Sequence, residues 1–185
     1  NDGQTCLGIP VTARESHTNG YRSNNTKRPS KVKWVTVDLE KEYRIDEVRL
    51  IPAWPREVTD AVGMGFPHSL KVLLSNDPQF KQNVIQLNSS AIPKHPWNNP
   101  YTVRVTGKKK RGRYLRVESL RLEGRGGNYF LALAEVQAFS VNKNVALGKP
   151  VFAGDASLAG AGPSRWAPEY LVDGFSSRYE LTDWT

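Results

Sequence analysis

The chain has 185 residues, of which 38% are hydrophobic and 10% aromatic, with five Trp. This length suits one domain plus a fragment of another, and no apolar run approaches the ~20 residues that a membrane-spanning helix needs. The formal net charge is +8, which attracts polyanions in general, whether nucleic acid, anionic lipid or acidic polysaccharide. Cys6 is the only cysteine, so the chain forms no internal disulfide and no multi-thiolate metal site.

Alternation of apolar and polar residues is the dominant pattern. It appears first at 34–39 (WVTVDL), where Trp34 is expected in the core, and then at 44–50. In the second segment, Ile45 and Val48 break the alternation and indicate a bulge or a strand start between them. Further strands are expected at 69–75, 83–87, 101–106, 113–118 and 132–139. Helical periodicity is absent, and the connections are rich in Pro, Gly and Asn, which predicts an all-β sandwich or jelly roll.

One internal repeat divides the chain. LGIPVTA, which begins at Leu7, returns as LGKPVFA, which begins at Leu147. We therefore expect one module at 1–140. Residues 141–185 are expected to be either the start of a second, incomplete module or a tail that docks on the first. A segment of about 45 residues buries too little apolar surface to fold alone.

The strand sequences resemble those of the discoidin, or factor V/VIII C-type, family. The shared elements are LG-PV-A, WVTVDL, IDEVRL, SLKVLLSND, YLRV and ALAEVQAF, and the likeness extends from Leu7 to Phe139. The family includes bacterial carbohydrate-binding modules attached to glycan-degrading enzymes. The resemblance implies a galactose-binding-domain-like jelly-roll β-sandwich that binds its ligand with loops at one end.

The first module departs from the family just before WVTVDL. It lacks the Asp-Gly turn that, in the family, helps to form a structural calcium site. The second copy contains such a turn at Asp173-Gly174. We therefore expect the tail to supply the missing turn beside Glu135, with Asp173 and Glu135 as candidate calcium ligands.

No catalytic constellation is apparent in the sequence. The three histidines, His17, His68 and His95, show no metal-ligand spacing. GRGGN at 124–128 precedes a strand in an all-β context, which disfavours a phosphate-binding loop. The acidic residues on strands are interpreted as solvent-facing charges and not as the paired carboxylates of a glycosidase. We expect a segment that is not itself an enzyme.

Ligand-binding candidates come from three loops that the resemblance places at one end of the sandwich. The segment 51–69 is long, and long loops in compact domains are usually functional. An aromatic platform with a few fixed donors suits a pyranose, since the ring covers the C–H face and the donors bind the hydroxyls. The alternative for the aromatic residues is that they fold back and close the end of the sandwich. The candidates are Trp54, Arg56, Phe66 and His68 in this loop, Tyr21, Arg22 and Asn25 in 17–30, and Arg125, Asn128 and Tyr129 in 120–131.

The strongest charge cluster is KKKRGR at 108–113. Such a run is typical of a patch that binds heparin-like polymers or nucleic acid, or of a solvated turn between strands, and we expect the turn. No nucleic-acid partner is expected, because the basic residues are scattered and are not arranged with stacked aromatics.

The leading interpretation is a carbohydrate-binding module of a secreted or cell-surface multimodular protein, which holds a glycan-degrading enzyme near its glycan. Neighbouring modules would raise the avidity. Two alternatives stay open. One is an adhesion module whose loop tips enter an anionic membrane surface, which the net charge of +8 favours. The other is a structural spacer that packs on a catalytic domain of the same parent chain.

Overall fold

A computed structural model of the chain describes residues 11–58, 60–88, 100–106, 110–155 and 165–182. Cys6, the first repeat copy up to Pro10, and Lys108 and Lys109 of the basic cluster lie outside these residues. In chain order the elements are β1 (Val11–Glu15), β2 (Tyr21–Arg22), β3 (Lys33–Arg44), β4 (Glu47–Ile51), β5 (Ser69–Ser75), β6 (Ile85–Gln86), β7 (Tyr101–Arg104), β8 (Arg111–Arg121), β9 (Glu123–Arg125), β10 (Asn128–Phe130), β11 (Ala132–Leu133), β12 (Glu135–Ser140), β13 (Lys143–Asn144), β14 (Val151–Ala153), the 3-10 helix η1 (Pro168–Leu171) and β15 (Tyr179–Leu181).

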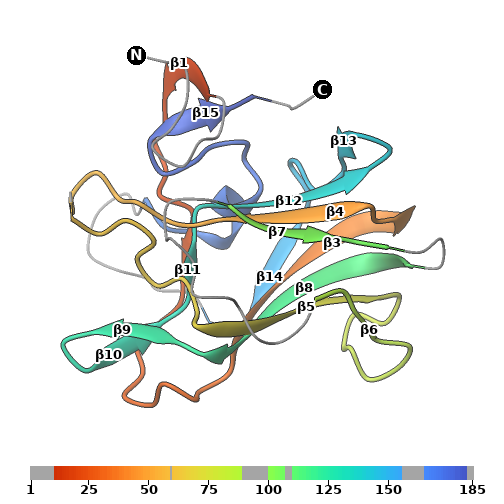
Figure 1. Cartoon of the computed structure of the whole chain (residues 1–185), viewed down its shortest axis with the longest axis horizontal. Helices are drawn as coiled ribbons and strands as arrows, with labels where there is room; N and C mark the ends of the chain where they lie inside the picture. The colour runs from red at the N-terminus through yellow and green to blue at the C-terminus, as the bar shows by residue number, and fades with distance from the viewer. Residues whose placement is uncertain (1–10, 59, 89–99, 107–109, 156–164, 183–185) are drawn as a thin grey trace.

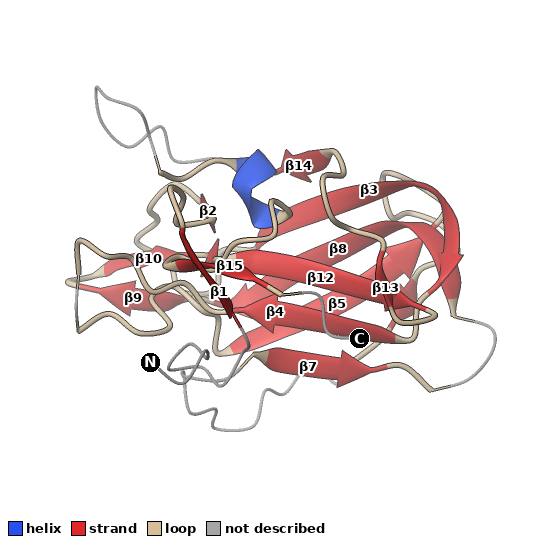
Figure 2. Ribbon diagram, turned by 90° about the horizontal axis from the view of Figure 1, so that it is seen from above, coloured by secondary structure: helices blue, strands red, loops and turns tan. Residues whose placement is uncertain are grey.

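Two antiparallel sheets form the body of the protein. One has five strands in the order β14-β3-β8-β5-β6, and the other has four in the order β13-β12-β4-β7. They lie face to face, with the smaller two-stranded pairs at one end and above (Figures 1 and 2). The expectation of an all-β sandwich of the jelly-roll type is confirmed.

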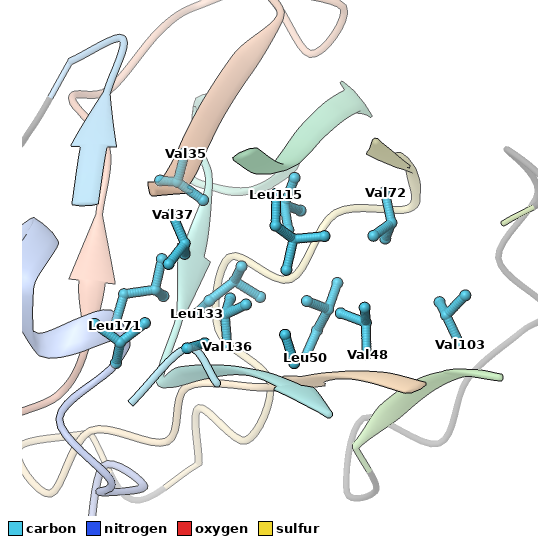
Figure 3. Packing of buried hydrophobic residues seen from close by; sticks show 14 of the residues in the cluster. Val35, Val37, Val48, Leu50, Val72, Val103, Leu115, Leu133, Val136 and Leu171 are labelled. Atoms are coloured by element: carbon cyan, nitrogen blue, oxygen red, sulfur yellow. The ribbon is translucent and has the colours of Figure 1, made fainter. Parts of the chain in front are cut away.

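The alternation of side chains along the strands fills the space between the sheets. Apolar residues of β3, β8 and β5 face those of β4, β12 and β7 (Figure 3). The expectation that Trp34 lies in the core is wrong. It alternates with the buried Val35 and therefore lies half-buried on the outer face of the five-stranded sheet. The core residues with 1% exposure or less include Val35, Val37, Val48, Leu50, Val72, Leu115 and Val136.

The strand boundaries follow the sequence pattern closely where the alternation is strict. The predicted strand at 69–75 coincides with β5. The break predicted near Ile45 is the gap between β3 and β4. The predicted strand at 132–139 is divided at Ala134 into β11 and β12. The helix η1 was not predicted, because its four residues are too few to show a helical period. No helix among the described residues has the length and apolarity to cross a bilayer.

The tail contributes directly to the sandwich. The strand β14 pairs with β3, and β15 pairs with β1, both antiparallel. Val145, Ala146, Leu171 and Val172 belong to the same hydrophobic cluster as the central strands. Figure 1 shows β14 lying alongside β3. The described part of the tail is thus packed against the first module, while its assignment as the start of a second module stays a prediction.

Candidate functional site

The three predicted loops meet at the end of the sandwich where β4 ends and β5 begins (Figure 1). Three side-chain contacts connect them: Asn19 Nδ2 to Glu57 Oε2 at 3.2 Å, Lys27 Nζ to Asn128 Oδ1 at 2.7 Å, and Arg125 Nη2 to the Asp60 carbonyl at 3.3 Å. The loops therefore form one continuous polar surface on a rigid scaffold.

Ser177 joins this surface to the tail. Its hydroxyl accepts a hydrogen bond from the Trp54 backbone N–H at 3.0 Å and donates one to the Asn19 carbonyl at 3.0 Å. Ser177 exposes only 2% of its surface, so both bonds are shielded from water and hold their geometry firmly. One buried hydroxyl thus fixes the relative positions of the 17–30 loop, the 52–68 loop and the tail.

Trp54 forms the aromatic part of the site together with Arg178. The guanidinium carbon of Arg178 lies 3.6 Å from the centre of the Trp54 ring, which is cation–π contact. Trp54 is half-buried. The Nε and Nη2 atoms of Arg178 are buried and have no hydrogen-bond partner among the described residues. Buried donors without a partner cost free energy, and the cation–π contact with Trp54 offsets part of that cost.

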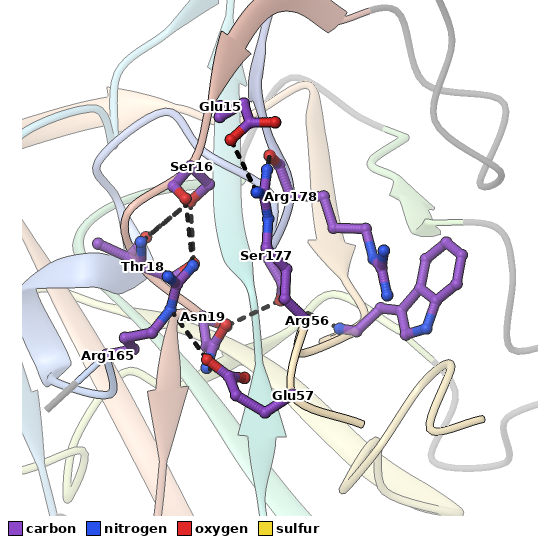
Figure 4. A network of polar contacts seen from close by, with 10 residues as sticks. Glu15, Ser16, Thr18, Asn19, Arg56, Glu57, Arg165, Ser177 and Arg178 are labelled. Atoms are coloured by element: carbon purple, nitrogen blue, oxygen red, sulfur yellow. Dashed lines mark hydrogen bonds and ion pairs between the residues drawn. The ribbon is translucent and has the colours of Figure 1, made fainter. Parts of the chain in front are cut away.

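Arg56 is held in place beside this pair (Figure 4). Its Nη1 donates to Glu15 Oε2 at 2.8 Å, and its Nη2 donates to the Arg178 carbonyl at 2.8 Å. The hydrogen bond from Arg56 lowers the pKa of the Glu15 carboxyl. The predicted donor is therefore present at the site. Its guanidinium also connects the 52–68 loop to β1 and to the tail.

Arg165 extends the network on the other side of Asn19 (Figure 4). Its Nη2 donates to the carbonyl of Ser16 at 3.1 Å, and its Nε lies 3.3 Å from Glu57 Oε1. The sequence interpretation did not include Arg165, Ser177 or Arg178. All three belong to the tail. Its contribution to this end of the fold is seen only in the three-dimensional structure.

Arg22 and Asn25 form a second part of the surface. Arg22 Nη2 donates to Asn25 Oδ1 at 2.6 Å, and the guanidinium carbon lies 4.2 Å from the centre of the Phe130 ring. Burial lowers the pKa of Arg22. Asn25 is exposed, so this pair presents a positioned amide next to an aromatic-supported cation.

The hairpin of β9 and β10 carries the last group of predicted residues. Gly126 and Gly127 adopt positive φ angles of 56° and 72° at its tip, which glycine adopts readily. Tyr129 exchanges backbone hydrogen bonds of 2.8 Å with Thr26 in both directions, which anchors the hairpin to the 17–30 loop. Arg125 is exposed at the tip, and Asn128 is half-buried beside it.

The structure corrects two candidates. Tyr21 exposes 0% and Phe66 exposes 1% of its surface, and both belong to the main hydrophobic cluster. The hydroxyl of Tyr21 donates to the carbonyl of Asp155, and burial raises the pKa of this phenol. Both rings close the end of the sandwich, so neither contacts a ligand. His68 is exposed at the other end of the same loop.

Asp173 and Glu135 lie next to each other, as expected from the tail. The N–H of Gly174 donates to Glu135 Oε1 at 3.1 Å, and Thr18 Oγ1 donates to Asp173 Oδ2 at 2.9 Å. Glu135 is fully buried, and its Oε2 has no hydrogen-bond partner among the described residues. Burial, followed by the nearby Asp173 charge, raises the pKa of Glu135 well above its usual value.

Two neighbouring carboxyls with an orphaned oxygen fit a hard cation such as Ca²⁺, which takes six to eight oxygen ligands in flexible geometry. Backbone carbonyls and water would have to supply most of these ligands. No group of three or more His, Cys, Asp or Glu side chains placed to hold a metal ion occurs in the described part of the chain.

No protein-family model matches this chain, and no curated protein matches it by sequence. Among solved structures, a fragment of a protein described as a chitobiase from Bacteroides thetaiotaomicron is 16% identical, with a TM-score of 0.47. That match covers 61% of this chain and 63% of the fragment, which is less than two thirds of its length.

Two further solved structures are binding modules. A chitosan-binding module of a chitosanase/glucanase from Paenibacillus is 14% identical, with a TM-score of 0.46 over 76% of this chain and 88% of that module. A carbohydrate-binding module from Clostridium perfringens, solved with GalNAc-β-1,3-galactose, is 14% identical, with a TM-score of 0.41 over 61% of this chain and 78% of that module. Similarity this low carries no information on a ligand, which has to come from the site itself.

Proposed function

We propose that this chain is a non-catalytic carbohydrate-binding module of a secreted or cell-surface multimodular protein, which it holds near a glycan. The observation that carries the proposal is the Trp54–Arg178 pair, set beside Arg56 and fixed by Ser177 at the loop end of the sandwich. A sugar ring stacks its C–H face on an aromatic surface and exchanges hydrogen bonds with charged donors at its rim.

The rigidity of this end supports the proposal. The loops are connected through Asn19, Ser177 and Glu57 rather than through solvent. A ligand that binds there orders few additional side chains. The loss of side-chain entropy therefore subtracts less from the binding free energy of a single sugar. A multimodular parent protein, such as a glycan-degrading enzyme, would raise the effective affinity further.

The test is a glycan array followed by calorimetry of the full chain with the strongest hit. We expect Trp54→Ala to weaken binding at least tenfold, which corresponds to ~1.4 kcal/mol, and Arg178→Gln to weaken it as well. Arg104→Gln removes the same charge from a side chain that is 86% exposed at the end of β7, and it should bind normally.

Two results would overturn the proposal. One is glycan binding that survives both Trp54→Ala and Arg178→Gln in folded protein. The other is an absence of glycan hits together with salt-sensitive sedimentation with anionic vesicles, which would favour a membrane-surface module, since exposed charge attraction is screened by salt.

We further propose that Asp173 and Glu135 hold a structural calcium ion. The support is the buried Glu135 carboxyl with its unpartnered Oε2, the adjacent Asp173 and the turn at Gly174. When bound, the ion would compensate the two carboxylates and fasten the tail to β12. Its test is the response of thermal stability to calcium and to a chelator.

A further inference from the structure

The outer face of the five-stranded sheet carries a pocket that shares no residue with the loop-end site. Its volume is about 240 Å³, and its lining residues are Trp34, Thr36, Pro78, Tyr114, Arg116 and Phe152. Five of the six come from the neighbouring strands β14, β3 and β8, and Pro78 comes from the connection between β5 and β6. The pocket is therefore built mainly on the sheet itself.

The strand register explains why these side chains gather. Phe152 pairs with Thr36, and Thr36 pairs with Arg116, so the three form a row across β14, β3 and β8. Their neighbours along each strand, such as Val35 and Val117, are buried in the core. Because side chains alternate between faces, the whole row points away from the core.

Arg116 forms the polar centre of the pocket. Its guanidinium carbon lies 4.3 Å from the centre of the Trp34 ring and 4.1 Å from that of Phe80, so the cation is held between two aromatic rings. Its Nε donates to Thr36 Oγ1 at 2.9 Å, and its Nη2 donates to the Pro78 carbonyl at 3.4 Å. These contacts fix the guanidinium before any ligand arrives.

The charge of Arg116 is balanced differently from that of its neighbour Arg113. It forms no ion pair in the described part of the chain, whereas the neighbouring Arg113 binds Asp38 at 2.7 Å. Glu118 and Asp77 act on Arg116 only through space, and burial lowers its pKa. Nη1 has no hydrogen-bond partner among the described residues. A half-buried, preorganised guanidinium of this kind is complementary to a carboxylate.

The rest of the pocket is apolar and open. Phe152 exposes 54% of its surface, although burial of this side chain would be favourable. A Cβ on Gly154 would lie 2.9 Å from Trp34 Nε1, so the absence of a side chain there leaves room for the indole. An aromatic surface beside a fixed cation suits a sugar ring that also carries a negative charge.

We propose that the pocket formed by Trp34, Phe152 and Arg116 is a binding subsite for an acidic sugar residue, a uronate. The C–H face of the sugar packs on Phe152 and Trp34, and its carboxylate accepts hydrogen bonds from Arg116. The subsite goes beyond the loop-end site and stands or falls independently of it.

The experiment is calorimetry of the full chain with tetragalacturonate and with its fully methyl-esterified form, which has the same rings without the charge. We expect the uronate to bind and the ester to bind at least tenfold more weakly. Arg116→Gln should weaken uronate binding at least tenfold, and Phe152→Ala should weaken it several-fold. Arg104→Gln and Val141→Ala, which change an exposed charge and an exposed apolar side chain elsewhere, are the matched controls.

Several outcomes would overturn the proposal. They are no binding of the uronate, equal binding of acid and ester, or unchanged binding in folded Arg116→Gln and Phe152→Ala. Loss of uronate binding in Trp54→Ala alone would move the ligand to the loop end and would support that site instead. Self-association that Phe152→Ala abolishes would show that a second copy of the chain covers the pocket. The indole N–H resonance of Trp34, assigned with Trp34→Phe, provides a direct readout, since it should shift only with the acidic ligand.

Discussion

The guanidinium of Arg178 lies 3.6 Å from the centre of the Trp54 indole, so the tail and the 52–68 loop form one surface. We expect the pair to stabilise the fold as well as to shape the site. A double-mutant cycle of Trp54→Leu and Arg178→Met should give a coupling free energy of about 1 kcal/mol in chemical denaturation. The cycle of Trp54→Leu with Arg28→Met, an exposed arginine, is the control. A coupling free energy near zero for the first cycle would show that Trp54 and Arg178 do not stabilise each other.

Leu171 tests whether the tail is part of the folded body. It is fully buried in the main cluster, whereas Leu147 in the same tail is 45% exposed. Leu171→Ala should lower the free energy of unfolding by roughly 2–5 kcal/mol, as large-to-small core substitutions do. Leu147→Ala should change it by less than about 1 kcal/mol. If both variants unfold like the wild type in urea, the tail does not support the sandwich.

Gly20, in the 17–30 loop, packs against the backbone of Leu133 and Ala134 and has a φ angle of 98°. A Cβ there would lie 2.2 Å from the Leu133 carbonyl oxygen, a contact with backbone that cannot move aside cheaply. We expect Gly20→Ala to cost several kcal/mol of stability or to prevent folding. Gly126→Ala is the matched control, since its φ is also positive but no atom lies within 4 Å. It should cost only ~1 kcal/mol, as measured by thermal unfolding.

The ion pair of Asp38 and Arg113 should make stability depend on acid. Arg113 donates to both carboxylate oxygens of Asp38, at 2.7 and 2.8 Å, and lowers the pKa of this carboxyl. The folded state therefore binds the Asp38 proton more weakly than the unfolded state does. The stabilisation is present above the unfolded pKa, near 4, and is lost as the pH falls through the lower folded pKa.

Asp38→Asn should accordingly destabilise the protein by about 1.5–3 kcal/mol at pH 7. The difference from the wild type should shrink in urea titrations as the pH falls below 4. Asp60→Asn, whose side chain is 84% exposed, should follow the wild type at every pH. If the free energy of unfolding of Asp38→Asn differs from that of the wild type by the same amount down to the lowest pH, the charge of Asp38 does not stabilise the fold.

Calcium addition tests the role of Glu135 and Asp173. At 100-fold excess over the dissociation constant, a ligand that binds only the folded state adds ~2.7 kcal/mol. We expect the melting temperature at pH 7.5 to rise by several degrees with CaCl₂ and to fall again with a chelator. Glu135→Gln should abolish this response, while Glu169→Gln, an exposed acid in η1, should keep it. Identical melting curves with calcium and chelator would refute the calcium site.

Strict alternation made the body of this fold predictable from sequence. The runs SLKVLLS and WVTVDL identify β5 and the centre of β3, because apolar residues stand at every second position and fill the core: Leu70, Val72 and Leu74 in β5, and Val35, Val37 and Leu39 in β3. The same rule also places Trp34 opposite Val35 and Val37, on the outer face. The core assignment for Trp34 failed because it relied on residue type, whereas its position in the alternation gave the correct face.

The candidate site was less predictable because it is assembled from distant segments. The long loop identified Trp54 and Arg56, but no local pattern shows that Arg178 stacks on Trp54 from more than a hundred residues away. Phe66 and Tyr21 are aromatic residues in loop segments, as a ligand-binding aromatic residue would be. Only their packing in the core distinguishes them from such a residue. The Asp173 turn was predictable because the repeat brought a missing motif back later in the chain.

The outer strands of both sheets are very short. The strand β14 has three residues, while β6 and β13 have two each. The fourth edge, β7, has four residues, and Arg104 at its end is almost fully exposed. A long unpaired edge is what allows one chain to extend the sheet of another, and charged side chains oppose it. These short and charged edges therefore oppose the joining of sheets between copies of the protein.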